Sequence, residues 1–159
     1  MSERLLVSTL YAGALLLTVW AGGKAIGYFQ DYRFYSTFLA PWQRALGAYG
    51  ETGRPWPVFS GSNHVAYMEA VVSSLRGAVG FRPLGEGRGA FMYRVDKPGQ
   101  DGQDVFLLAL PGRIVLYGLF RGSAERVDGF VDGQRNLGAG TFQAAPSQDG
   151  LTVTAVWRY

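Results

Sequence analysis

The sequence contains no cysteine and a single histidine, His64. The absence of thiols excludes disulfide bonds, thiolate catalysis, cysteine-ligated zinc, iron–sulfur clusters and the attachment of c-type haem. A metal site built on one histidine without cysteine is not expected, and we interpret His64 as a polar residue at the start of a helix. We therefore expect neither a metal nor a cofactor.

Charged residues are also scarce. They make up 17% of the chain, below the quarter that is usual in soluble domains, while 48% of the residues are apolar. The only lysines are Lys24 and Lys97, so the net charge of +3 comes mostly from arginines, which are scattered from Arg4 to Arg158. Proteins that bind nucleic acid gather their basic residues on one face. We therefore expect no nucleic-acid partner.

Catalytic signatures are missing as well. The glycine-rich segment 84–90 lacks the Lys-Ser/Thr pair of a phosphate-binding loop, and the acidic residues of 96–104 lack the spacing of a calcium loop. We interpret 96–104 as a solvated hairpin loop. Ser60 and Ser62 lie close to His64 in sequence, but no third group is present to orient a nucleophile. We expect that the protein is not an enzyme.

One long apolar run is present. Residues 5–23, "LLVSTLYAGALLLTVWAGG", carry no charge between Arg4 and Lys24. As a helix they would cover roughly 28 Å, close to the ~30 Å thickness of bilayer hydrocarbon, and we predict a transmembrane helix. The alternative is a cleaved signal peptide, although the run is long for one. The short tail before it favours a cytoplasmic amino terminus, with the remaining chain in the periplasm or otherwise outside the cytoplasm.

An aromatic segment follows directly. Residues 28–42, "YFQDYRFYSTFLAPW", place seven rings in fifteen positions. The first rings suit the aromatic belt of a membrane interface, whereas the distal ones lie too far along the helix and are expected to pack on protein. Pro41 is expected to kink or end the helix near Ala40. The residues expected to contact protein or the membrane interface are Tyr28, Tyr32, Phe34, Tyr35, Phe38, Trp42 and, further along, Trp56.

Small residues recur at four-residue spacing in the same region. Gly23 and Gly27 form a GxxxG step, and Thr9 with Gly13 forms a second pair. Such pairs allow another helix to approach closely. The expected partners are the membrane bilayer, other subunits of a membrane complex and, in a homo-oligomer, a second copy of the chain.

The remaining chain alternates between helical and strand patterns. A helix is predicted from near Asn63 to Gly80, strands over 89–96 and on both sides of Pro111-Gly112, a helix within 123–136, and a hairpin around 146–150. This order predicts an α+β fold, an antiparallel sheet with helices on one face, for which a permuted ferredoxin-like arrangement is one solution.

The chain is thus expected to have three parts. A transmembrane and juxtamembrane helical segment covers 1–46, a Gly/Pro-rich linker covers 47–62, and an α+β domain outside the cytoplasm covers 63–159. Residues 54–159 are expected to fold on their own.

This layout resembles that of type II secretion protein M and the type IV pilus alignment protein O. These are inner-membrane scaffold components with a short tail, one membrane helix, a connecting helix and a ferredoxin-like periplasmic domain. The chain departs from the family in residues 24–46, where an aromatic segment interrupted by proline replaces a charged coiled coil.

The resemblance rests on layout and on no motif, and it implies a non-catalytic, single-pass scaffold or assembly subunit of a multi-protein membrane complex. The alternative is an accessory structural subunit of a respiratory or photosynthetic membrane complex that binds no cofactor itself.

Overall fold

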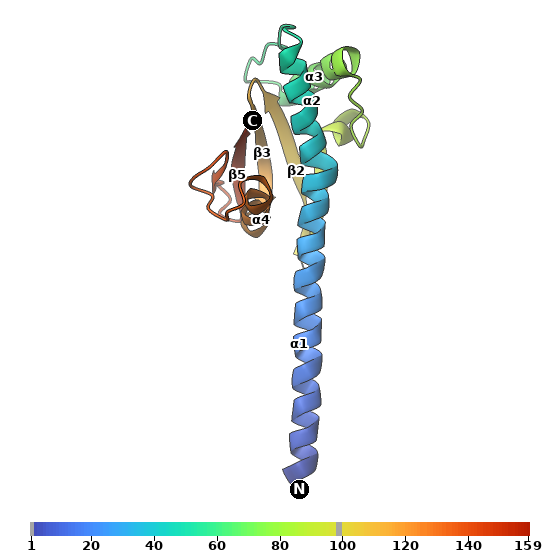
Figure 1. Ribbon diagram of the computed structural model, residues 1–159, viewed down its shortest axis with the longest axis vertical. Coiled ribbons are helices and arrows are strands. Elements are labelled where there is room, and N and C mark those ends of the chain that lie inside the picture. Colours follow the sequence, from blue (N-terminus) through green and yellow to red (C-terminus); the bar gives the residue numbers. More distant parts are fainter. Residues whose placement is uncertain (1, 98–99) are drawn as a thin grey trace.

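The structure is a computed structural model that describes residues 2–97 and 100–159. A long helix rises from the amino terminus, and a compact domain packs along its upper part (Figure 1). The elements in chain order are α1 (Ser2–Arg33), the π-helix η1 (Phe34–Leu39), α2 (Ala40–Glu51), α3 (His64–Val79), the 3-10 helix η2 (Gly87–Ala90), β1 (Met92–Lys97), β2 (Gln100–Leu110), β3 (Arg113–Phe120), α4 (Arg121–Val131), β4 (Phe142–Pro146) and β5 (Thr152–Arg158).

The five strands form one antiparallel sheet in the order β1-β2-β3-β5-β4. This confirms the predicted α+β class. Within it, β2, β3, β5 and β4 follow the strand order of a permuted ferredoxin-like unit, and β1 is an additional edge strand. The two predicted hairpins are present, since β2 and β3 flank Pro111-Gly112 and β4 and β5 flank the turn at 147–151.

One face of the sheet is covered by helices. Strand pairing places Tyr93 opposite Val105 and Leu107 opposite Leu116 on this face. The ring of Phe34 in η1 lies 5.1 Å from that of Tyr93, and α4 packs beside α1 over the same face. On the opposite face Tyr117 remains 38% exposed. The long helix and α4 therefore cover one face of the sheet, whereas α3 lies at an edge, where its His64 contacts Phe106 and Tyr117 of the opposite face.

Helix α3 covers an edge of the sheet that β1 leaves open. The pairing between β1 and β2 stops at Met92 and Phe106. Beyond that point the Tyr67 hydroxyl donates to the Ala109 carbonyl at 2.8 Å, and the Ala109 amide donates to Met68 Sδ at 3.2 Å. Backbone groups of an exposed edge strand would otherwise invite pairing with another chain. The helix begins at its Asn63 cap and ends at Gly80 with φ +67°, as the sequence predicted.

The long helix does not end at Pro41, so of the two outcomes expected there, a kink or an end, the end is wrong. Residues 34–39 adopt the wider π-helical form, and the Ala40 amide bonds to the Tyr35 carbonyl five residues earlier. Pro41 then lies in the first turn of α2, where a missing N–H is tolerated. The extra residue in the preceding turn gives the proline ring room, so helical structure continues to Glu51.

The upper part of this helix belongs to the core of the domain. Residues 47–51, expected in the linker, are helical. The side chains of the helix that are less than a tenth exposed in this core are Phe34, Phe38, Leu39, Trp42, Ala45, Leu46 and Tyr49. The Trp42 indole N–H donates to the Ala90 carbonyl at 3.1 Å. A unit that begins at residue 54 would lack all of these side chains, so residues 34–51 are structurally part of the domain that the sequence placed at 63–159.

Candidate functional site at the junction of the long helix and the domain

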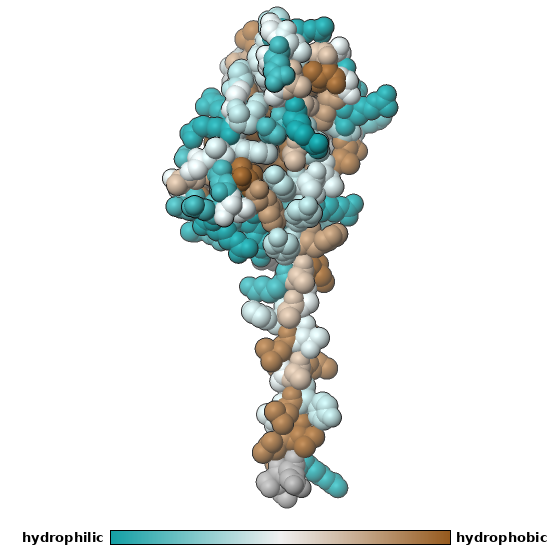
Figure 2. All heavy atoms as spheres, viewed as in Figure 1, coloured by the Kyte–Doolittle hydropathy of each residue, from teal (hydrophilic) through white to brown (hydrophobic). Residues whose placement is uncertain are grey.

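The lower half of α1 stands free of the domain and is mostly apolar (Figure 2). In the part of the chain that the structure describes, one helix is long and apolar enough to cross a membrane, and its most apolar stretch is entirely unburied. Thr9 and Gly13 lie in this free part, and a Cβ added at Gly13 would meet no atom within 4 Å. These two residues therefore contact no other element of the chain.

Above the free part, α1 packs against α4 through aromatic rings. The ring of Phe130 lies 5.5 Å from those of Tyr28 and Tyr32 and 5.6 Å from that of Tyr35. Tyr35 also lies 6.2 Å from Trp157 of β5. Aromatic pairs at these separations contribute about 0.5–1.5 kcal/mol each beyond the burial of area. Tyr28 and Tyr32 thus contact this chain's own domain, while about half of each side chain remains exposed.

The distal rings lie inside the domain, and the rings of the connecting segment pack against it while partly exposed. Phe38 stacks on Phe34 with 5.7 Å between centroids, and Trp42 meets Phe81 at 4.9 Å. Trp56 packs on Tyr49 at 5.2 Å, which fastens the segment after α2 to that helix. The aromatic residues singled out in the sequence are therefore brought together around α1, η1 and α2.

The GxxxG step has two different environments. Gly27 is buried, and a Cβ added there would lie 3.8 Å from the Arg126 guanidinium, so the element that approaches it is α4 of the same chain. A Cβ added at Gly23 would meet nothing within 4 Å. Gly23 instead lines an open cleft below α4.

A charge cluster that the sequence reasoning missed fixes this junction. Asp31 of α1 is fully buried, and its Oδ2 accepts a hydrogen bond from Arg126 of α4. Lys97 Nζ of β1 lies 3.6 Å from the same oxygen. A buried charge is tolerated only when it is paired and hydrogen-bonded. The signal available in the sequence was a single acid within an aromatic stripe, but its partner Arg126 lies 95 residues away.

Lys97 is held in a largely desolvated position. Its side chain is 13% exposed, and Nζ lies 5.3 Å from the centroid of the Phe120 ring. Burial lowers the pKa of Lys97, the negative charge of Asp31 opposes this effect, and the positive charge of Arg126 adds to it. The single carboxylate of Asp31 thus faces two cations, and its Oδ1 has no hydrogen-bond partner among the described residues.

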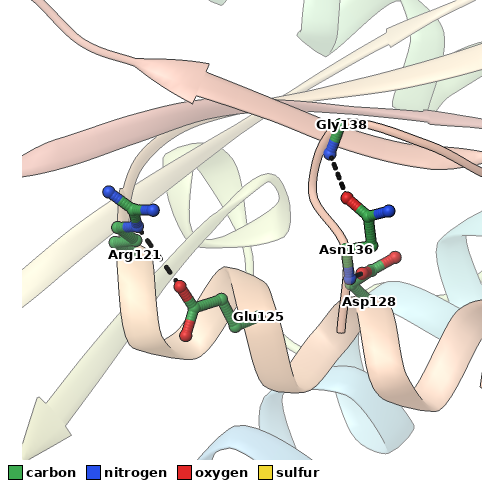
Figure 3. A network of polar contacts seen from close by, with 5 residues as sticks. All are labelled: Arg121, Glu125, Asp128, Asn136 and Gly138. Carbon is green, nitrogen blue, oxygen red and sulfur yellow. Dashed lines mark hydrogen bonds and ion pairs between the residues drawn. The ribbon is translucent and has the colours of Figure 1, made fainter. Parts of the chain in front are cut away.

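The other side of α4 is fastened by polar contacts (Figure 3). The Asp128 carboxylate accepts a hydrogen bond from the backbone amide of Asn136. The side-chain oxygen of Asn136 in turn accepts one from the backbone amide of Gly138 at 3.2 Å. Asp132 accepts from the Phe142 amide at 2.8 Å. Burial raises the pKa of Asp128, whereas hydrogen bonds, first that of Phe142, lower the pKa of Asp132. These contacts hold α4 in place, and with it Arg126, which faces α1.

The remaining sequence candidates do not assemble into a reaction centre. His64 lies 5.1 Å from the Phe59 ring and near Phe106 and Tyr117. Ser60 Oγ lies 3.0 Å from Ser62 Oγ, and the described side chains show no hydrogen bond between either serine and His64.

The acidic segment 96–104, expected to be a loop, is mostly strand, because 96–97 belong to β1 and 100–104 to β2, and residues 98–99 lie outside the described residues. Arg94 of β1 pairs with both Asp96, at 3.1 Å, and Asp104, at 3.6 Å. Within 2–97 and 100–159, no group of three or more histidine, aspartate or glutamate side chains lies close enough to hold a metal ion.

The junction thus consists of packed rings and paired charges that join α1 to α4 and β1. Rings and a buried charge cluster fix the direction in which α1 leaves the domain. Comparison of the chain with protein-family models, curated proteins and solved structures finds no match.

Proposed function

We propose that this protein is a non-catalytic, single-pass membrane subunit that acts as a scaffold or assembly component of a multi-protein membrane complex. Its α+β domain lies outside the cytoplasm in this proposal. The observation that carries it is the helical continuity from the free apolar half of α1 into the core of the domain.

The continuity matters because it limits the heights and orientations that the domain can adopt relative to the apolar half of α1. A flexible tether would let the domain sample many heights and orientations above a membrane. Here the helix from Arg4 to Glu51 has no break, and Asp31 joins it to α4 and β1. A domain held at a fixed height and angle suits the positioning of other subunits. The layout shared with the secretion and pilus scaffold components favours the same role.

The exposed apolar stretch of α1 leaves surface for partners within the bilayer. Thr9 and Gly13 lie on that stretch without contact to the domain, and small residues at this spacing favour close packing of helices. We propose this part of α1 as the contact with another subunit or with a second copy.

Copurification tests the proposal. Membranes containing the tagged chain would be solubilised in a mild detergent, and the partners identified by mass spectrometry. Two variants would be compared. Gly13→Leu adds bulk within the small-residue pair, whereas the control Leu16→Ile keeps the side-chain volume on the same free helix. The proposal expects partners that Gly13→Leu loses and Leu16→Ile retains.

Two results would contradict the proposal. A chain that purifies alone from every detergent has no scaffold role. Copurification with a haem- or pigment-bearing complex would favour the accessory-subunit alternative instead. The orientation is tested separately by single cysteines at Ser2 and Ser62, because the chain has no cysteine of its own. An impermeant maleimide added to intact cells should label only Ser62→Cys.

A further inference from the structure

A cleft opens at the base of the domain, where α1 passes below α4. Its volume is about 580 Å³, within the roughly 300–1,000 Å³ that is usual for small-ligand sites. One wall is α1 from Val19 to Gly27, and the other is the junction of β3 and α4 with Lys97 and Leu151. The cleft exists because Gly23 and Gly27 place no side chain into it.

The charge of this cleft is positive. Its basic lining residues are Lys24, Lys97, Arg121 and Arg126, and none of the described residues that line it is acidic. Two neighbouring carboxylates offset some of this charge, since Asp31 pairs with Lys97 and Arg126, and Glu125 pairs with Arg121 at 3.2 Å. Four cations against two carboxylates leave a surplus of two positive charges, which complements an anion.

The cleft also has an apolar side, and that side points to the membrane. Val19 and Trp20 belong to the apolar stretch, while Lys24 marks its end. From Val19 to Gly27 the helix rises roughly 12 Å, and a headgroup layer is roughly 5–8 Å thick on each side of the hydrocarbon. The cleft therefore begins at the hydrocarbon edge and ends at the base of the domain. Trp20 and Leu151, two of its apolar residues, are 64% and 78% exposed.

The lysines of the cleft are not fully neutralised by neighbouring carboxylates. Lys24 Nζ lies 5.4 Å from the centroid of Trp20 and is paired with no carboxylate among the described residues. Lys97 is mostly buried and shares the single charge of Asp31 with Arg126. Burial lowers the pKa of Lys97, so an anion in the cleft would stabilise its charged form.

We propose that this cleft binds the phosphate of an anionic phospholipid from the leaflet next to the domain. The phosphate faces Lys24 and Arg121, and the acyl chains leave along Val19 and Trp20 into the bilayer. Basic residues beside a membrane helix are suited to anionic headgroups. A free phosphate ion would use the cations but not the apolar side of the cleft, which is why a lipid is the better occupant. This proposal rests on the anchoring of residues 5–23 in a membrane.

Lipid retention by the full chain tests the site. The purified protein would be exchanged into dodecyl maltoside micelles containing equal amounts of phosphatidylglycerol and phosphatidylcholine, and the bound lipid counted by native mass spectrometry. We expect one preferentially retained phosphatidylglycerol. Lys24→Gln with Arg121→Gln should weaken its retention by about 30-fold, because each basic residue near a membrane surface contributes about fivefold. The control pair Arg33→Gln with Arg113→Gln removes the same charge outside the cleft and should have little effect.

A steric pair separates the cleft from general surface charge. Gly23→Phe fills the cleft without changing any charge, whereas Gly22→Phe adds the same ring at a neighbouring position that does not line it. Neither added Cβ meets an atom within 4 Å, so both variants should fold. We expect Gly23→Phe to weaken retention at least tenfold and Gly22→Phe to leave it unchanged.

Three results would overturn the lipid site. They are equal retention of phosphatidylglycerol and phosphatidylcholine, equal effects of Gly23→Phe and Gly22→Phe, and displacement of the lipid by inorganic phosphate at millimolar concentration. Carbonate extraction of the same membranes distinguishes a failed anchor from a failed site. Release of the intact chain into the soluble fraction refutes the anchoring, whereas a retained chain without lipid selectivity refutes the site alone.

Discussion

Replacement of Trp42 by alanine tests whether the long helix is part of the domain's core. The side chain is 1% exposed, its ring packs on Phe81 and its indole N–H bonds to the Ala90 carbonyl. A buried tryptophan covers about 200 Å², worth about 5 kcal/mol at about 25 cal/mol per Å². Measured replacements of buried Phe or Trp by Ala cost about 3–5 kcal/mol. We expect a loss in that range, which is a large part of the 5–15 kcal/mol that usually stabilises a domain.

The assay is a urea titration of the full chain in detergent, followed by near-ultraviolet circular dichroism. Trp20→Ala is the matched control, because Trp20 is 64% exposed on the free part of α1. Trp42→Phe should lie in between, since it keeps a ring but leaves the Ala90 carbonyl without its donor, a change of about 1–3 kcal/mol. If Trp42→Ala lowers the unfolding free energy by less than 1 kcal/mol, no more than the control, then the helix is only attached to the domain and the reasoning fails.

Three further predictions concern the junction and the extent of the domain. Asp31→Asn should destabilise the chain by about 3 kcal/mol in the same titration, because Arg126 and Lys97 lose their counter-charge. A loss no larger than that caused by the exposed control Arg33→Gln would contradict this. Hydrogen bonds from the Phe142 amide and the Thr141 hydroxyl lower the pKa of Asp132, so its stabilisation is present at neutral pH and is lost as the pH falls through the folded value below 3.8. Asp132→Asn should therefore reduce the loss of thermal stability as the pH is lowered from neutral through 3.8, and an acid-induced loss as large as that of the unaltered chain would count against this role of Asp132. Finally, a fragment of residues 54–159 should show no cooperative unfolding, whereas 28–159 should, and a cooperative transition in the shorter one would place the domain boundary after α2.

Local patterns in the sequence were sufficient for most elements. Asn63 and Gly80 mark the ends of α3 because capping depends on a few neighbouring backbone groups. The Pro111-Gly112 turn and its two apolar flanks specify the β2–β3 hairpin for the same reason. The unbroken apolar run at 5–23 predicted a transmembrane helix, since it has no polar face to turn toward water, and the structure has a helix there that is long and apolar enough to cross a membrane.

Pro41 shows where a local rule was overridden. Proline normally ends a helix, but a wider turn at 34–39 accommodates it. That turn places Phe34 and Phe38 against Tyr93 of β1, and buried aromatic contacts of this kind outweigh the modest cost of a π-helical turn. No window of neighbouring residues contains Tyr93, so this outcome was beyond local reasoning.

The charge cluster and the cleft were decided by the tertiary structure alone. The sequence showed a single acid between rings and two lysines far apart, and nothing in their spacing indicates contact. The fold brings α4 and β1 to Asp31 because the aromatic face of the long helix must be buried against the sheet. The sequence by itself determined which segments are helix, strand and apolar stretch, since those depend on nearby residues. Only the packing of those segments decided which charges meet, because that depends on residues distant in the chain.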